Sequence, residues 1–186
     1  MAAVAKALHS SGEESWGTPL PIIDLARNIL GQIDLDPFSS AEWNKSLGAK
    51  RFISEEENGF ASSWGREGAL LTAMVNPPGD RRGENAKRAW RLTRDRHDDG
   101  TIGGGAVFIC FSLNQLQTLQ GIGRSPLDPL YLRLIPRRRL DYQRAPGVSG
   151  GAPPHPSEIV LLPSRVDRAW QAYQFSRLGA EIGEVF

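Results

Sequence analysis

Apolar runs of strand length recur along the chain and predict a sheet. The clearest runs are residues 69–75, 106–111 and 158–162, and shorter or alternating ones are residues 33–36, 51–54 and 130–135. Continuous apolar runs bounded by Gly, Pro or polar residues are typical of strands buried on both faces. The run at 106–111 is therefore predicted to be a central, parallel strand.

Helical periodicity separates several of these runs. Residues 20–30 repeat apolar positions every three or four residues, with Thr18 and Pro19 as predicted N-cap and first helical residue and Gly31 as the end. Ser39 or Ser40 is expected to cap a short helix over residues 41–45. Further predicted helices are residues 86–92, 114–120 and 166–178, the last closed by Gly179.

Alternating strands and helices predict an α/β layered fold with a largely parallel sheet. Residues 137–143 follow the strand at 130–135 and are either its antiparallel hairpin partner or a basic loop. Residues 1–14 show no periodic pattern and are expected to be a flexible leader. Residues 15–186 are then expected to form one domain, which suits a chain of 186 residues.

The composition argues against membrane-spanning, secreted and disulfide-bonded proteins. The chain is 40% hydrophobic and 23% charged, with a net charge of +1, which is ordinary for a soluble globular protein. No apolar run approaches the roughly 20 residues that span a bilayer, and no signal peptide is recognisable. The single cysteine, Cys110, excludes an intrachain disulfide and a cysteine-based zinc cluster, and the cytoplasm is the default location.

Polar residues follow two of the predicted strands at the points where the strands end. Asn76 comes directly after the run at 69–75, and Pro77 and Pro78 then stop the strand because neither can donate to a ladder. Asp36 ends the run at 33–36 in the same way. Ligands of open α/β sheets bind at the carboxyl ends of strands, although a plain strand and Pro-Pro loop gives the same pattern.

Basic residues cluster late in the chain. Five arginines lie between Arg133 and Arg144, with Asp141 as the only acid among them. This cluster is either a phosphate-contacting patch, centred on Arg137, Arg138 and Arg139, or a solvated surface.

Five short motifs follow one another between residues 15 and 80. They are Trp16-Gly17-Thr18-Pro19, residues 33–41 followed by Asn44, Phe52-Ile53-Ser54 before Glu57-Asn58-Gly59-Phe60, Trp64, and Asn76-Pro77-Pro78. In this order and spacing they resemble a known family, the phage-type DNA N6-adenine methyltransferases (the Dam-like family of phages and prophages).

The resemblance implies a single-domain Rossmann-like fold that binds S-adenosylmethionine and methylates adenine in double-stranded DNA of a bacterial host cell. Segments 80–105 and 130–156 would be the DNA-facing or variable parts. The residues implied in cofactor binding are Trp16, Thr18, Pro19, Asp36, Pro37, Phe38, Ser39, and Glu57 or Asn58. Asn76, Pro77 and Pro78 would hold the exocyclic amine of the flipped adenine, and the reaction would need no metal.

One position departs from the family pattern. The motif ends in an aromatic residue that stacks on the flipped base, whereas this chain has Gly79. Base–aromatic stacking is worth about 1–3 kcal/mol. Either Trp16, Trp90 or Phe111 then supplies the ring, or the pocket is wider and a larger group than methyl is transferred to a base. The remaining alternative is an inactive relative that binds DNA or a protein partner.

Overall fold

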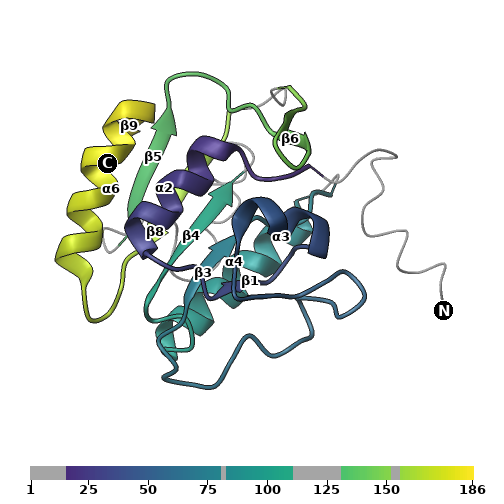
Figure 1. Ribbon diagram of the computed structural model, residues 1–186. Helices are drawn as coiled ribbons and strands as arrows, with labels where there is room; N and C mark the ends of the chain where they lie inside the picture. The colour runs from purple at the N-terminus through teal and green to yellow at the C-terminus, as the bar shows by residue number, and fades with distance from the viewer. Residues whose placement is uncertain (1–15, 81–82, 111–130, 152–155) are drawn as a thin grey trace.

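The computed structural model describes residues 16–80, 83–110, 131–151 and 156–186, which form an α/β fold around one large sheet (Figure 1). The helices are α2 (Leu20–Leu30), α3 (Ala41–Leu47), α4 (Glu84–Asp98) and α6 (Arg168–Ile182). The strands are β1 (Leu35–Asp36), β2 (Arg51–Phe52), β3 (Thr72–Val75), β4 (Gly105–Cys110), β5 (Leu132–Pro136), β6 (Gln143–Ala145), β7 (Val148–Ser149), β8 (Glu158–Leu162) and β9 (Gly183–Val185).

The large sheet has seven strands in the order β2-β1-β3-β4-β8-β5-β9. β2, β1, β3 and β4 pair in parallel, whereas β8 is antiparallel to both β4 and β5. β5 therefore points the same way as β4, and β9 is antiparallel to it. Five strands thus bring their carboxyl ends to one edge of the sheet, where ligands of such sheets bind.

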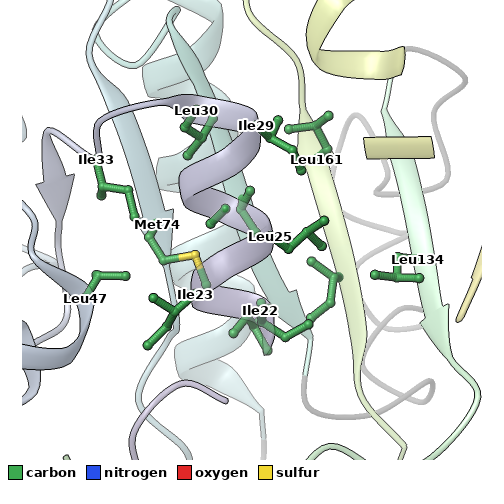
Figure 2. Packing of buried hydrophobic residues seen from close by; sticks show 14 of the residues in the cluster. Ile22, Ile23, Leu25, Ile29, Leu30, Ile33, Leu47, Met74, Leu134 and Leu161 are labelled. Atoms are coloured by element: carbon green, nitrogen blue, oxygen red, sulfur yellow. The ribbon is translucent and has the colours of Figure 1, made fainter. Parts of the chain in front are cut away.

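Two hydrophobic cores lie on opposite faces of this sheet. On one face, α2 and α6 cover the side chains of Met74, Val107 and Leu161, and Figure 2 shows α2 packed against this layer. On the other face, Trp90 of α4 packs edge-to-face against Phe108, with ring centroids 5.2 Å apart. Burial on both faces explains why β4 reads as a continuous apolar run.

The structure corrects several details of the predicted elements. Residues 137–142 are not a hairpin partner of β5, which pairs with β8 and β9. The late hairpin is instead a separate two-stranded sheet made of β6 and β7. β4 is central but parallel on one side only, because β8 is inserted beside it.

Two helix ends also differ from the prediction. α2 begins at Leu20 with Pro19 at the N-cap, so the Thr18 side chain is not its cap. α6 continues past Gly179 to Ile182. Gly179 is buried inside the helix, and an added Cβ there would lie 2.8 Å from Val185 Cγ2, so the close packing against β9 explains the glycine. The expected leader at 1–14 and the expected helix at 114–120 lie outside the described residues.

Candidate functional site

Asn76 lies directly after β3, at the edge where the parallel strands end. Its amide Nδ2 donates a hydrogen bond to Thr18 Oγ1 at 3.1 Å. Its Oδ1 is buried and accepts no hydrogen bond within the described parts of the chain. A buried acceptor without a partner costs about 1–3 kcal/mol. This oxygen is therefore an acceptor with capacity for a ligand N–H or O–H.

The residues after Asn76 become more exposed along the chain. Pro77 is buried, Pro78 is half-buried and Gly79 is exposed. A Cβ added at Gly79 would meet no atom within 4 Å, and its φ is not in the left-handed region. The backbone at Gly79 therefore accepts a larger side chain without strain.

Asp36 provides a second polar group at the same edge. It ends β1, which pairs in parallel with β3, so the ends of the two strands are neighbours. Asp36 is 6% exposed, and its Oδ1 accepts a hydrogen bond from the Phe38 amide at 3.1 Å. Burial raises the pKa of Asp36 to about 6, although the Phe38 amide and the nearby Ser39 hydroxyl act in the opposite direction.

Ser39 adds a third group with unused capacity. Its Oγ is buried without a partner that meets hydrogen-bond geometry in the described segments, and its amide donates to the Ile53 carbonyl at 3.1 Å. The N-cap of α3 is Ser40, whose Oγ accepts from the Trp43 amide at 3.2 Å. Ser39 is therefore not needed to start the helix, and its hydroxyl is available to a ligand.

Glu57 and Asn58 shape the loop that follows β2. Glu57 Oε2 accepts from the Ser54 amide at 2.9 Å, and Asn58 Oδ1 accepts from the Phe60 amide at 3.1 Å. Asn58 also has a φ of 59°, a left-handed conformation that Asn tolerates better than most residues. Both side chains therefore have structural roles, and their expected contact with a cofactor stays a prediction.

This loop packs against the residues after Asp36. The rings of Phe38 and Phe60 lie 4.6 Å apart, and an added Cβ at Gly59 would lie only 1.8 Å from the Pro37 carbonyl oxygen. Trp64 Nε1 donates to the Gly59 carbonyl at 2.8 Å. The structure thus brings the predicted residues of this region together as one packed unit.

The segment at 16–18 is held by an element that the sequence did not implicate. Gly17 and Gln143 exchange two backbone hydrogen bonds, of 2.8 and 3.0 Å. The buried Gln143 side chain donates from Nε2 to the Thr18 carbonyl at 2.5 Å. The β6–β7 hairpin therefore fixes Thr18 beside Asn76. No local pattern marks this role of Gln143, because Gly17 and Thr18 lie far from it in sequence.

The aromatic residues proposed to replace the missing ring lie in different environments. Trp90 is fully buried between α4 and the sheet, so it cannot stack on a base, which corrects that expectation. Trp16 is 43% exposed and packs against Gly150, where an added Cβ would lie 2.3 Å from its ring. Phe111 lies outside the described residues.

Arg137, Arg138 and Arg139 directly follow β5 and are all exposed. Because β5 points the same way as β3, these arginines lie at the same edge of the sheet as Asn76. Three strand spacings separate β5 from β3 in the sheet order, which is a lateral distance of about 14 Å. An exposed basic loop on this edge fits a phosphate-contacting role, but its partner stays a prediction.

Glu158 is a second buried carboxyl that sequence reasoning missed. It lies opposite Cys110 where β4 ends, and Arg133 Nη1 is 3.7 Å from its Oε1. Burial raises the pKa of Glu158 to about 7, and the charge of Arg133 acts in the opposite direction. Glu158 shares its sheet face with Val160, in the α4 core, and so lies on the opposite face from Met74 and α2.

Comparison with known proteins adds no identity: no family model, curated protein or solved structure matches this chain. Within the described residues, no helix is long and apolar enough to cross a membrane. In the same part of the chain, no group of three or more His, Cys, Asp or Glu side chains is arranged to hold a metal ion.

Proposed function

We propose that this protein is a DNA methyltransferase that transfers a methyl group from S-adenosylmethionine to the N6 amine of adenine. The observation that carries the proposal is the unpartnered, buried Oδ1 of Asn76 at the carboxyl edge of the sheet. An acceptor held there, with a proline on its C-terminal side, suits the binding of an exocyclic amine. The resemblance of residues 15–80 to the phage-type adenine methyltransferases supplies the reaction.

The residues near Asn76 fit such a cofactor by their hydrogen-bonding character. S-adenosylmethionine carries an ammonium group and ribose hydroxyls, which are hydrogen-bond donors. The buried carboxyl of Asp36 and the unpartnered hydroxyl of Ser39 are acceptors at the same edge. When bound, the cofactor supplies an electrophilic methyl group on a sulfonium. Asp36 and Ser39 would hold it, with the 16–19 segment at its border.

The protein's own contribution would be chiefly positioning. The adenine must leave the base stack, because its amino group is otherwise out of reach. Asn76 Oδ1 and the Pro77 carbonyl would then accept hydrogen bonds from the amine and increase the electron density on its nitrogen. Fixing this amine in line with the methyl group supplies most of the rate enhancement expected from such a site.

A methyl-transfer assay tests the proposal. The full-length protein is incubated with labelled S-adenosylmethionine and unmethylated double-stranded DNA that contains adenine, and label in N6-methyladenine is measured. Asn76→Ala is the matched control, because it removes the acceptor and leaves the backbone. Transfer by the wild type that is lost in the control supports the proposal, and wild-type label no higher than the control refutes it.

A second candidate function is a non-catalytic module that binds DNA or a protein partner through the same fold. Gly79 favours it, because no aromatic ring follows Pro78 and Trp90 is buried elsewhere. Titration calorimetry with S-adenosylmethionine separates the two candidates. A folded protein that shows no heat of binding, but still binds DNA in a gel-shift assay, would favour the module.

A further inference from the structure

Gln143 is a buried polar residue with an unusual number of partners. It begins β6 and is 2% exposed. Its Nε2 donates to the Thr18 carbonyl at 2.5 Å, and its Oε1 accepts from the Gly147 amide at 2.5 Å and from Ser46 Oγ at 3.4 Å. Buried polar groups are normally hydrogen-bonded, and here both ends of one carboxamide are used.

These contacts join parts of the chain that are far apart in sequence. Gln143 and Thr18 are separated by 125 residues, and the backbone hydrogen bonds between Gly17 and Gln143 add a second connection beside the first. The neighbouring Gly17 also packs against Trp43 of α3, because an added Cβ at Gly17 would lie 2.3 Å from its ring. The backbone at residues 17 and 18 is therefore fixed by several contacts before any ligand binds.

Thr18 transmits this placement to Asn76. Its carbonyl accepts from Gln143, while its Oγ1 accepts from Asn76 Nδ2 at 3.1 Å. With Nδ2 engaged, Oδ1 is the end of the Asn76 amide that remains for a ligand. We propose that Gln143 is a positioning residue that acts through Thr18. It holds the Asn76 amide so that Oδ1 accepts a hydrogen bond from the target amine. This rests on the function proposed above.

The inference predicts an effect on turnover that exceeds the effect on binding. Displacing a reacting or positioning group by about 1 Å costs about 100-fold in rate. Loss of the Gln143 hydrogen bond frees Thr18 and lets the Asn76 amide move. Asp36 and Ser39, which would hold the cofactor, are not among the hydrogen-bond partners of Gln143 in the described residues, so the affinity for S-adenosylmethionine should change far less than the rate.

Gln143→Glu is the sharpest test variant. It keeps the size of the side chain and the acceptors for Gly147 and Ser46, but it replaces the donor that faces the Thr18 carbonyl with an oxygen. Ser46→Ala is the matched control, since it removes the other side-chain contact of Gln143 and leaves the path to Asn76 intact. Gln143→Leu serves if the glutamate variant does not fold.

The first readout does not require methyl transfer. In ¹⁵N-labelled protein, the Asn76 side-chain NH₂ signals are identified by their absence from Asn76→Ala. Thr18→Val removes the hydroxyl and shows how these signals respond when the contact is lost. Gln143→Glu should shift the Asn76 NH₂ signals in the same direction as Thr18→Val does, or broaden them. Ser46→Ala should leave these signals in place. Unchanged signals in a folded Gln143 variant, or an equal change in Ser46→Ala, would overturn the inference.

The second readout separates this inference from the proposed function. If the wild type methylates DNA, Gln143→Glu should lower kcat by about 10- to 100-fold and leave the Kd for S-adenosylmethionine within about twofold. A purely structural role would instead lower thermal stability and weaken binding, with kcat preserved, and that result would also overturn the inference. If the wild type transfers no methyl group, the proposed function fails and the NMR comparison alone decides the role of Gln143.

Discussion

Replacing Asp36 by asparagine should stabilise the protein at neutral pH. The Asp36 carboxyl is buried, and the Phe38 amide at 3.1 Å and the nearby Ser39 hydroxyl only partly compensate its ionised form for the lost hydration. Burial raises its pKa from the ordinary 3.8 to about 6. This difference corresponds to about 3 kcal/mol, because one pH unit is worth about 1.4 kcal/mol.

The direction of the pH dependence follows from where the proton binds more tightly. Between about pH 4 and about pH 6 the folded protein keeps the Asp36 proton that the unfolded chain has lost. The contribution of Asp36 to the free energy of unfolding therefore falls as the pH rises through this window. Above it, the wild type carries the full cost of about 3 kcal/mol. Asparagine keeps the shape and the acceptor oxygen and carries no charge.

Urea unfolding of both proteins at about pH 4 and about pH 7.5 measures the effect. Asp34→Asn is the matched control from the segment before β1. Burial by itself raises the pKa of Asp34, but hydrogen bonds from Lys50 Nζ at 2.7 Å and the Thr72 amide at 3.0 Å outweigh it and hold the pKa below its ordinary value. Asp34→Asn should therefore destabilise the protein at neutral pH, opposite to Asp36→Asn.

Two results would refute this reasoning. Asp36→Asn could be no more stable than the wild type at about pH 7.5, or its gain could be just as large at about pH 4, where the folded wild type keeps the Asp36 proton and carries no charge there. Either result would mean that the ionised carboxyl is not the source of the cost. Under the proposed function, the same variant should bind S-adenosylmethionine more weakly. The stability cost of Asp36 would then be the consequence of keeping an acceptor at the site.

Three further changes give testable outcomes. Gly79→Tyr introduces a ring into open space, and it should tighten DNA binding, or lower KM, by the equivalent of about 1–3 kcal/mol, with Gly79→Ala as the control. Trp64→Phe removes the 2.8 Å hydrogen bond to the buried Gly59 carbonyl, and it should lower the free energy of unfolding by about 1–3 kcal/mol in a denaturant titration. Changing Arg137, Arg138 and Arg139 together to Ala should reduce the salt dependence of DNA binding, flattening the slope of log K against log salt by up to about 3, and an unchanged slope would exclude phosphate contacts there.

Local sequence was a good guide to the strands and to the polar groups that end them. β3 and β4 appear in the sequence as apolar runs because burial on both faces selects such side chains. Parallel neighbours end at the same edge, so Asn76 and Asp36 could be placed together in advance. The exact helix ends were less predictable, as Gly179 shows. A glycine inside a helix is indistinguishable in sequence from one that ends it.

The sequence by itself determined the main strands of the large sheet and placed Asn76 and Asp36 at its carboxyl edge, but it did not indicate β6, β7, β9 or the buried Glu158. Only the tertiary structure decided that β8 lies between β4 and β5, and that Gln143 hydrogen-bonds to Thr18 beside Asn76. The physical reason is range. Hydrophobic periodicity and proline geometry act over a few residues, whereas strand order and the pairing of buried polar groups depend on the packing of the whole chain.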